Sequence, residues 1–556
     1  MLQKDALNIL KLGHTTFLTG PAGSGKSFVL REYVAYLRRH NIRYAVTAST
    51  GIASTHINGT TIHSWSGLGV KDAINKYELD AMEEKQNLYK RYNETSVVIV
   101  DEVSMLSSPF LDMFDQACKH MRRNAEPFGG LQIIFCGDFF QLPPIVKFGD
   151  VNKALAYNSH AWKESKPVTC YLTEQHRQDD DVLTKILDQI RKGDIDEFVW
   201  ENLSERSSEN GENSFAYDEE HIKLYTHNVD VDSINAQAYE KLEGKEKVYQ
   251  MIHKGKAKLV EALKKNCLAD ETLRLKIGAK IICIKNDIER KYVNGSMGVV
   301  VDFESDDMPV IELTNGMRLK IKADSWKIEE EGKVKAEITQ LPLRLAWAIT
   351  IHKSQGMTLD RAEIDLSRAF ASGMGYVALS RLRSITGLYL KGVHPNAFAI
   401  SEDVMNEDIL FQKKNNNAEG AIKKYDEEKL QKMFDEFILK CGGDLEERKI
   451  DDIEEEELSE RKSTIILTKE LLDSKKSLAE VAKIRAITVA TVLGHIEKLK
   501  ESGEKLDIDH LLPNKKDTKI IKDTFEELET TKLTPVFEHL KGKYEYDDLR
   551  LVRVTL

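Results

Sequence analysis

Cysteines are few in this sequence, and long apolar runs are absent. The six cysteines are scattered without any Cys-x-x-Cys pair, which argues against a disulfide framework and a structural zinc site. No stretch approaches the roughly 18 uninterrupted apolar residues of a membrane span, and the N-terminal MLQKDALNIL does not resemble a signal peptide. We therefore expect reduced thiols, no membrane partner and an intracellular protein, cytoplasmic in a bacterium and nuclear or mitochondrial in a eukaryote.

The excess of negative charge is concentrated in one segment. Residues 401–460 hold 20 acidic and 9 basic residues, and this excess of 11 equals the net charge of −11 of the whole chain. The remaining sequence is close to neutral, so the net charge does not exclude a nucleic-acid partner. We interpret the densest acidic run, at 451–460, as a solvated linker or helix surface, with shielding of a basic site as the alternative.

Length and hydrophobic period indicate several domains. A chain of 556 residues is too long for one core and suggests three or four units of about 150 residues. Over 1–175, apolar strands such as SVVIVDE and LQIIFCGD alternate with helical stretches. This rhythm predicts an α/β fold built on a parallel sheet.

The pattern changes twice further along the chain. From 271 to 339 the period is two in KIICIK, GVVVDF, PVIEL and RLKIKA, which favours a small inserted antiparallel barrel. The α/β pattern then resumes over 340–400. An acidic helical linker is expected at 401–461, and a compact helical domain at 462–556.

The stretch GPAGSGKS at 20–27 follows an apolar strand and precedes a helical stretch. This context is typical of a phosphate-binding loop, in which backbone N–H groups and the helix N-terminus surround phosphate oxygens. Lys26 would reach the β and γ phosphates of ATP, and the Ser27 hydroxyl would bind Mg²⁺. The remaining ATP-binding candidates are Gly20, Pro21, Ala22, Gly23, Ser24 and Gly25.

Further polar residues follow later strands and complete a hydrolytic site. Asp101 at the end of VVIVDE would hold Mg²⁺, and Glu102 would polarise the attacking water. Gln141, in FFQLPP after the strand IIFCGD, is a candidate sensor of the γ-phosphate, with an ordinary loop amide as the alternative. Arg177 and Arg381 are candidate arginine fingers for the transition-state charge, with surface salt bridges as the alternative.

The stretch AITIHKSQGMTLD at 348–360 begins as a buried strand and then becomes polar. Ligands of α/β domains bind in loops at the carboxyl ends of strands. Donors in such a loop suit the phosphates of a nucleic acid. The donors here are His352, Lys353, Ser354 and Gln355, of which the first three are the candidate DNA contacts.

Eight motifs in order resemble superfamily 1 DNA helicases, in the branch that contains RecD and the PIF-type helicases. They are GPAGSGKS, TASTGIAS, TTIHSWSGLG, VIVDEVSML, GDFFQLPP, LTEQHRQ, AITIHKSQGMTLD and YVALSRL, and they extend over about 1–395. Residues 104–130 resemble the signature helix of the PIF type. The resemblance implies two RecA-like domains, at 1–175 with a wedge near 58–95 and at 176–270 with 340–400, and an SH3-like barrel at 271–339.

The resemblance also implies roles for individual residues. Gln3 falls where the family reads adenine, and the DNA backbone contacts would be Thr50, Gly51, His63 and Ser64 together with His352, Lys353 and Ser354. Trp65 is expected either to stack on bases or to pack in the core.

The implied function is an ATP- and Mg²⁺-dependent helicase that moves 5′ to 3′ on single-stranded DNA and acts on forked DNA, G-quadruplexes and R-loops. Its processes would be DNA repair, recombination and telomere maintenance, and the expected state is a monomer. Two alternatives stay open. One is a helicase for RNA or RNA–DNA hybrids, and the other is a nucleotide-switched DNA-binding protein that does not unwind.

Beyond the helicase motifs, residues 477–503 predict two amphipathic helices around a short turn. This is the pattern of a helix-turn-helix, and the segment resembles the modules appended to some RecQ-type and PIF-type helicases. The alternative is a plain helical hairpin that docks on the motor or on a protein. Glu497 and the scarcity of cations on the second helix favour that alternative.

Overall fold

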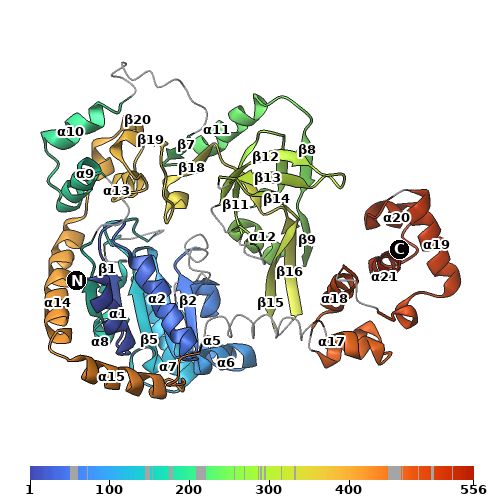
Figure 1. Ribbon diagram of the computed structural model, residues 1–556, viewed down its shortest axis with the longest axis horizontal. Coiled ribbons are helices and arrows are strands. Elements are labelled where there is room, and N and C mark those ends of the chain that lie inside the picture. Colours follow the sequence, from blue (N-terminus) through green and yellow to red (C-terminus); the bar gives the residue numbers. More distant parts are fainter. Residues whose placement is uncertain are drawn as a thin grey trace. The chain divides into compact units, whose positions relative to one another are not determined.

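The computed structural model describes most of the chain (Figure 1). It leaves out residues 51–59, 70, 72, 145–150, 153, 175–179, 208–220, 256, 268, 286, 288–290, 293–295, 315, 331–332, 449–464, 466–467, 486, 502–505 and 529. The chain divides into two compact units, Met1–Lys327 with Ala336–Glu447 and Ile328–Lys335 with Arg448–Leu556. Across the described residues, no helix is both long and apolar enough to cross a membrane. All six cysteines are free.

The first sheet has six parallel strands in the order β3-β2-β4-β5-β1-β6. Its central strands are buried along nearly their whole length, as expected for a parallel sheet covered on both faces. The predicted α/β pattern over the first 175 residues is therefore confirmed. The strands are β1 (Thr16–Thr19), β2 (Tyr44–Ala48), β3 (Thr60–Thr61), β4 (Val97–Asp101), β5 (Gln132–Cys136) and β6 (Val168–Tyr171).

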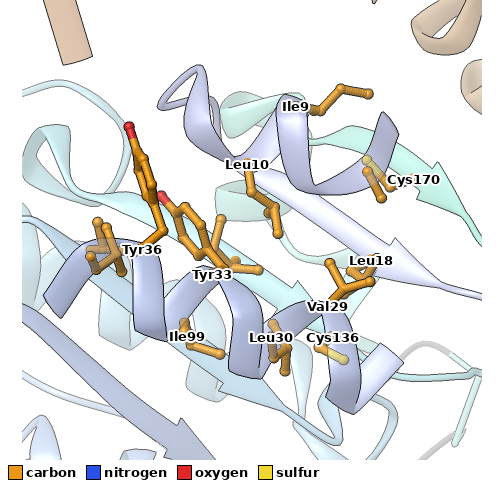
Figure 2. Close-up of a cluster of buried hydrophobic side chains, with 14 of the residues drawn as sticks. Ile9, Leu10, Leu18, Val29, Leu30, Tyr33, Tyr36, Ile99, Cys136 and Cys170 are labelled. Carbon is orange, nitrogen blue, oxygen red and sulfur yellow. The ribbon is translucent and has the colours of Figure 1, made fainter. Parts of the chain in front are cut away.

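Helices cover both faces of this sheet. On one face, α1 (Gln3–Lys11) and α2 (Lys26–Arg39) pack Leu10 and Leu30 against Leu18, Ile99 and Cys136 of three strands (Figure 2). Side chains alternate along a strand, so residues next to these in β5 point to the opposite face. There Phe135 stacks on Trp162 of α8 (His160–Ser165), 4.7 Å between ring centroids, beside the signature helix α7 (Ser108–Arg122).

The expected wedge near 58–95 contains three short helices, α4 (Ile62–Trp65), α5 (Lys76–Glu83) and α6 (Gln86–Glu94). Helices α5 and α6 pack on α7. Trp65 is 8% exposed, and its ring lies 5.1 Å from Tyr92 and 6.1 Å from Phe114. The prediction that Trp65 stacks on bases is therefore wrong, and the core-packing alternative is right.

A second parallel sheet has the order β18-β7-β19-β20. It confirms that the α/β pattern resumes near residue 340 and that the two parts of the second α/β domain form one sheet. Its strands are β7 (Ile222–Tyr225), β18 (Ala348–Thr350), β19 (Ala362–Leu366) and β20 (Leu388–Val393). Its helices are α9 (Asp181–Lys192), α10 (Glu197–Ser204), α11 (Asn228–Glu240) and α13 (Met374–Leu379).

The antiparallel insertion is present, but its predicted bounds of 271–339 are too narrow. The strand β8 (Lys247–Gln250) pairs with β10 (Thr272–Leu275), and β9 (Ile252–Gly255) pairs with β16 (Lys333–Gln340). These pairings place 247–255 in the insertion rather than in the second RecA-like domain. The helix α12 (Ala257–Asn266) lies between β9 and β10 in sequence.

The main sheet of the insertion has the order β14-β13-β12-β11-β17. Among the described strand pairings β14 and β17 are its edges, so these pairings give an open sheet and not a closed barrel. Its core contains Ile281, Val300 and Ile311. The remaining strands are β11 (Lys280–Cys283), β12 (Met297–Phe303), β13 (Pro309–Leu313), β14 (Arg318–Lys320), β15 (Asp324–Glu330) and β17 (Leu343–Leu345).

The segment 401–461, expected to be an acidic helical linker, is helical over most of its described length, but its helices are packed on a domain and do not form a free linker. Residues 402–440 form α14 (Glu402–Ile422) and α15 (Glu427–Lys440), which pack on the first RecA-like domain. Phe411 is 3% exposed with its ring 4.9 Å from Phe17, and Ile422 and Phe437 join the core of Figure 2. These helices therefore have a charged exposed face and a buried apolar face. The acidic run 451–460 lies outside the described residues.

The second unit contains the predicted helix pair, α17 (Leu478–Ile484) and α18 (Val489–Glu501). Val481, Val492 and Ile496 are buried between the helices as expected, but Ile484 is 56% exposed and lies outside this core. A capping box between Ser477 and Glu480 starts α17. The described part of the unit also includes α19 (Lys515–Glu527), α20 (Leu533–His539) and α21 (Tyr546–Val554).

Candidate nucleotide and nucleic-acid site

The phosphate-binding loop joins β1 to α2 through three glycines with positive φ, Gly20 (+144°), Gly23 (+88°) and Gly25 (+85°). A Cβ at Gly20 would lie 2.5 Å from the carbonyl oxygen of Leu172, so this position requires glycine. The Lys26 ammonium donates to the carbonyl oxygens of Gly20 (2.8 Å) and Pro21 (2.9 Å). Burial lowers the Lys26 pKa, and the nearby Asp138 carboxylate opposes this effect.

The two expected Mg²⁺ ligands have chemistry that suits this ion. Ser27 is exposed in the first turn of α2, and Asp101 is the last residue of β4 and half-buried. Within the described residues, no cluster of three or more His, Cys, Asp or Glu side chains could hold a metal. Mg²⁺ commonly takes one or two protein oxygens and completes its shell with water and phosphate. One hydroxyl and one carboxylate therefore fit Mg²⁺ bound together with a nucleotide.

Glu102 occupies a strained turn after β4, with φ 52° and ψ 45°. Two hydrogen bonds hold the turn. The Glu102 N–H donates to Asp101 Oδ1 (2.9 Å), and Ser49 Oγ donates to the Glu102 carbonyl oxygen (2.8 Å). Burial and the neighbouring Asp101 charge raise the pKa of Glu102 to about 7, although Arg381 and Lys26 act in the opposite direction. A carboxyl group with this pKa can accept a proton at neutral pH.

Gln141 is 6% exposed, and its Oε1 atom has no hydrogen-bond partner among the described residues. A buried acceptor without a partner costs stability and calls for an explanation, such as an absent ligand. Gln141 also lines a cavity of about 350 Å³, whose wall includes His352 and Phe370 of the second RecA-like domain. The residues that line this cavity include none from the loop 20–27, so the sensor role of Gln141 stays a prediction.

Arg381 follows α13 and is only 2% exposed. Its Nε donates to the Val377 carbonyl oxygen (3.0 Å) and its Nη2 donates to Ser380 Oγ (2.8 Å). Its charge acts to lower the pKa of Glu102. The surface salt-bridge alternative is therefore wrong for Arg381, and the finger role stays a prediction. Arg177 lies outside the described residues.

The adenine candidate Gln3 begins α1, beside the phosphate-binding loop. Its Nε2 donates to the Ser24 carbonyl oxygen at 3.5 Å. The side-chain amide is half-buried. A position beside the loop is compatible with contact to a nucleotide base, and the adenine role stays a prediction.

The loop after β18 forms a 3₁₀ turn, Ile351–Ser354. Lys353 is half-buried, and burial with the nearby Arg344 lowers its pKa to about 8. His352 is also half-buried, and its ring lies nearly parallel to that of Phe370, 6.1 Å between centroids. Ser354 is fully buried and donates its hydroxyl to the Ile351 carbonyl oxygen (2.8 Å), so this hydroxyl stabilises the turn and is not presented to DNA.

The candidate DNA contacts of the first domain differ in exposure. Ser64 is exposed in α4, whereas Thr50 and His63 are half-buried. The His63 ring packs 4.2 Å from that of Phe110, and burial lowers the His63 pKa. Ser64 is thus the most accessible of the three, and Gly51 lies outside the described residues.

Three residues at this site are absent from the sequence-based candidates. Asp138, Arg191 and Tyr376 form a buried cluster next to the phosphate-binding loop. Asp138 belongs to the motif GDFFQLPP and Tyr376 to the motif YVALSRL. These motifs indicate where the site lies, but they do not indicate what the two residues do there. Arg191 lies in an ordinary amphipathic helix, α9, and has no such signal.

The fold and site define a nucleotide-binding protein with two parallel α/β sheets, a phosphate-binding loop on the first and a buried arginine from the part that forms the second. A family model for PIF1-like helicases matches residues 3–200, one for the Pif1 2B domain matches 258–303, and one for a helix-turn-helix domain matches 464–553. The chain is 36% identical to the ATP-dependent DNA helicase Pif1 of Psychrobacter sp. (strain PRwf-1) across 100% of both chains. It belongs to the PIF1-like helicase family.

Other relatives cover the motor region. The human ATP-dependent DNA helicase PIF1 is 35% identical over 73% of this chain and 62% of its own length. The crystal structure of Pif1 helicase from Candida albicans is 32% identical with a TM-score of 0.68, covering 73% of this chain and 98% of that one. A Bacteroides Pif1 structure in complex with ADP-AlF3 and ssDNA is 28% identical with a TM-score of 0.58, and the match covers 74% of this chain and 97% of that one.

The raised pKa of Glu102 yields a prediction about pH. Only the carboxylate form can accept a proton from water, so kcat/KM should rise with pH below about 7, the pKa of Glu102, and then level off. Glu102→Gln should bind nucleotide normally and lose turnover at every pH. The measurement is steady-state ATPase activity between about pH 6 and 8.

Nucleotide affinity of the Gln variant over the same range accounts for titration of the nucleotide itself. Glu94→Gln, at a side chain that is 51% exposed on α6, is the matched control. Near wild-type turnover in Glu102→Gln, or a flat wild-type profile, would contradict the assignment of Glu102 as the base.

Proposed function

We propose that this protein is an ATP-dependent DNA helicase that moves 5′ to 3′ on single-stranded DNA and unwinds duplex or structured DNA. The observation that carries the proposal is the buried site itself. The charges of Lys26 on the first RecA-like domain and of Arg381 on the second, which is 2% exposed, both act to lower the pKa of Glu102. Relatives of 36% and 35% identity are named ATP-dependent DNA helicases, which supports the same activity here.

In this proposal, residues from both RecA-like domains contribute to ATP hydrolysis. The loop 20–27 would hold the phosphates, and Glu102 would orient and deprotonate the attacking water. Arg381 would stabilise charge on the transferred phosphoryl group. Mg²⁺, held by Ser27 and Asp101, would neutralise phosphate charge when bound. Because the site needs both domains, binding and release of the γ-phosphate would close and open the gap between them.

Movement requires that the DNA contacts belong to the same two domains. The cationic Lys353 comes from the second domain, and the exposed Ser64 comes from the first. Alternate closing and opening would then shift one contact along the strand while the other holds. The Bacteroides Pif1 structure in complex with ADP-AlF3 and ssDNA supports simultaneous binding of nucleotide and single-stranded DNA. Forks, G-quadruplexes and R-loops are the proposed substrates, in repair, recombination and telomere maintenance.

Direction and substrate class are tested together by unwinding. Duplexes with a 5′ or a 3′ single-stranded tail, made of DNA, RNA or hybrid, are mixed with the wild-type chain and with Lys26→Ala. We expect unwinding of the 5′-tailed DNA and ATPase activity that single-stranded DNA stimulates, because opening and closing act on a bound strand. The Lys26→Ala variant should be inactive in both.

Three outcomes would contradict parts of this proposal. Preferred unwinding of 3′-tailed DNA would reverse the direction. Preferred unwinding of RNA or hybrid duplexes would favour that class of helicase. ATP binding without hydrolysis or unwinding would favour a nucleotide-switched DNA-binding protein.

For the C-terminal module we propose contact with duplex DNA through α18. The acidic Glu497, which argued against a DNA-binding helix, is not on a free surface. It accepts hydrogen bonds from Arg550 at 2.7 and 3.1 Å and from Arg553 at 2.8 Å, both on α21. Thr491 and Lys498, two turns apart on α18, are exposed. The exposed face of the helix therefore offers a hydroxyl and an ammonium to a groove.

This proposal predicts a loss that depends on the DNA substrate. The double substitution Thr491→Ala with Lys498→Ala should weaken binding to duplex-containing forks by about fivefold and reduce the salt slope by about one, as expected for one lost phosphate contact. Affinity for plain single strands should not change. Lys519→Ala, an exposed lysine on α19, is the control. Equal fork affinity of the double variant and the wild type would favour docking of the module on the motor or on a protein.

A further inference from the structure

A buried polar cluster lies where α9 and α13 of the second RecA-like domain meet the first domain. Arg191 Nη1 donates to both carboxylate oxygens of Asp138, at 2.8 and 2.7 Å, and to the Tyr376 hydroxyl at 3.1 Å. Asp138 follows β5 of the first domain, whereas Arg191 belongs to α9 and Tyr376 to α13. The three side chains thus join the two domains through charge-assisted hydrogen bonds.

The Tyr376 hydroxyl also reaches the phosphate-binding loop. It accepts a hydrogen bond from the Ala22 N–H at 3.0 Å and donates to Asp138 Oδ2 at 3.3 Å. With the Arg191 contact, the one hydrogen and both lone pairs of this hydroxyl are used. Tyr376 is 1% exposed. One oxygen atom of the second domain is therefore fixed against the backbone of the nucleotide site of the first.

Helix α13, which carries Tyr376, packs closely against the first domain. Gly373, the N-cap of α13, lies so close to the loop after β5 that a Cβ would stand 2.5 Å from the Phe140 carbonyl oxygen and 2.8 Å from that of Gln141. The Arg191 guanidinium stacks over the Phe140 ring at 4.0 Å. Backbone packing and side-chain hydrogen bonds thus both fix the position of α13 against the first domain.

The cluster keeps its charges at neutral pH. Burial alone would raise the pKa of Asp138, but the positive charges of Arg191 and Lys26 outweigh it and lower this pKa. Burial, opposed by Arg191, raises the pKa of Tyr376 to about 12. The ion pair and the neutral phenol are therefore both present under working conditions, as the hydrogen-bond pattern requires.

We propose that Tyr376 is a positioning residue for hydrolysis, which fixes the register between the phosphate-binding loop and the segment that carries Arg381. Tyr376 lies on α13, and Arg381 follows the same helix five residues later. Arg191 and Asp138 hold the hydroxyl in place. Because the hydroxyl bonds the loop backbone and not a phosphate, its loss should disturb turnover and leave nucleotide affinity nearly unchanged. The inference rests on the proposed ATP hydrolysis by this site.

The test compares Tyr376→Phe with the wild type under saturating single-stranded DNA. Phenylalanine keeps the ring and removes one hydroxyl, so the variant is expected to fold. Loss of this buried hydrogen bond should lower kcat about tenfold. The dissociation constant for a fluorescent ATP analogue should stay within about twofold, because no group that touches the nucleotide is removed.

Tyr225→Phe is the matched control. Tyr225 lies in β7 and is 5% exposed, and its hydroxyl bonds Glu363 (3.0 Å) and Lys391 (3.0 Å), both in the second domain. The Tyr225→Phe variant loses a part-buried hydroxyl whose hydrogen bonds do not cross the domain interface. Its kcat should remain within about twofold of the wild type, since its hydrogen bonds do not join the domains.

A double-mutant cycle separates positioning from general packing. Arg191→Lys keeps the charge but removes the planar fork that holds Asp138 and Tyr376 together. If both residues act through one hydroxyl, the combined variant should lose no more kcat than the worse single variant. Simple addition of the two losses would overturn the proposal. So would unchanged kcat in Tyr376→Phe, or a fall in nucleotide affinity large enough to explain its lower rate. A wild-type chain without ATPase activity would instead overturn the proposed function.

Discussion

The structure depends on one constraint, which is that the charges of the nucleotide site are buried and must be matched across a domain interface. An unpaired ion removed from water costs several kcal/mol. Here the charges of Asp138 and Glu102 act to raise the pKa of Lys26, and Asp138 accepts hydrogen bonds from Arg191. Removing either domain would leave part of this set uncompensated. The match of charges therefore explains why the site is built from both RecA-like domains and not from one.

The parallel sheets place these groups at one edge. The phosphate-binding loop, the Asp101–Glu102 pair and Asp138 follow β1, β4 and β5, which are adjacent in the sheet order. The carboxyl ends of parallel strands lie at the same edge, so residues distant in sequence meet there. Helix α14 then stabilises the back of the same domain. Phe411 packs on Phe17 of β1, the strand that leads into the loop.

Much of this arrangement could be predicted because its signals are local. The glycines of 20–27 are required by positive φ and close approach, and the strand pattern follows from a hydrophobic period. The features that the local pattern does not predict depend on distant partners. Strands β8 and β9 belong to the insertion because they pair with strands that lie later in the sequence. Arg191 carries no local signal because only the folded chain brings it to Asp138.

Distant partners also explain why the predicted solvent exposure of some residues differs from their burial in the structure. The acidic composition of 401–461 predicts a helical linker, whereas the aromatic cluster around Phe411 buries one face of α14. Ser354 stands in a polar loop, yet its hydroxyl turns inward to the Ile351 carbonyl oxygen. Glu497 argues against a DNA-binding helix from the sequence alone, but in the structure its carboxylate is paired with two arginines of α21. Composition describes a segment, whereas burial and pairing depend on its neighbours.

The central claim is that Arg381 of the second domain completes a hydrolytic site on the first. The most direct measurement is single-turnover ATP hydrolysis by Arg381→Ala, with nucleotide binding measured in parallel. Loss of an arginine finger should slow hydrolysis on the order of 10³-fold or more while binding persists. Arg383→Ala, two residues away at a side chain that is 57% exposed and paired with Asp360 at 3.0 Å, is the control. A loss below about tenfold in Arg381→Ala would contradict the claim.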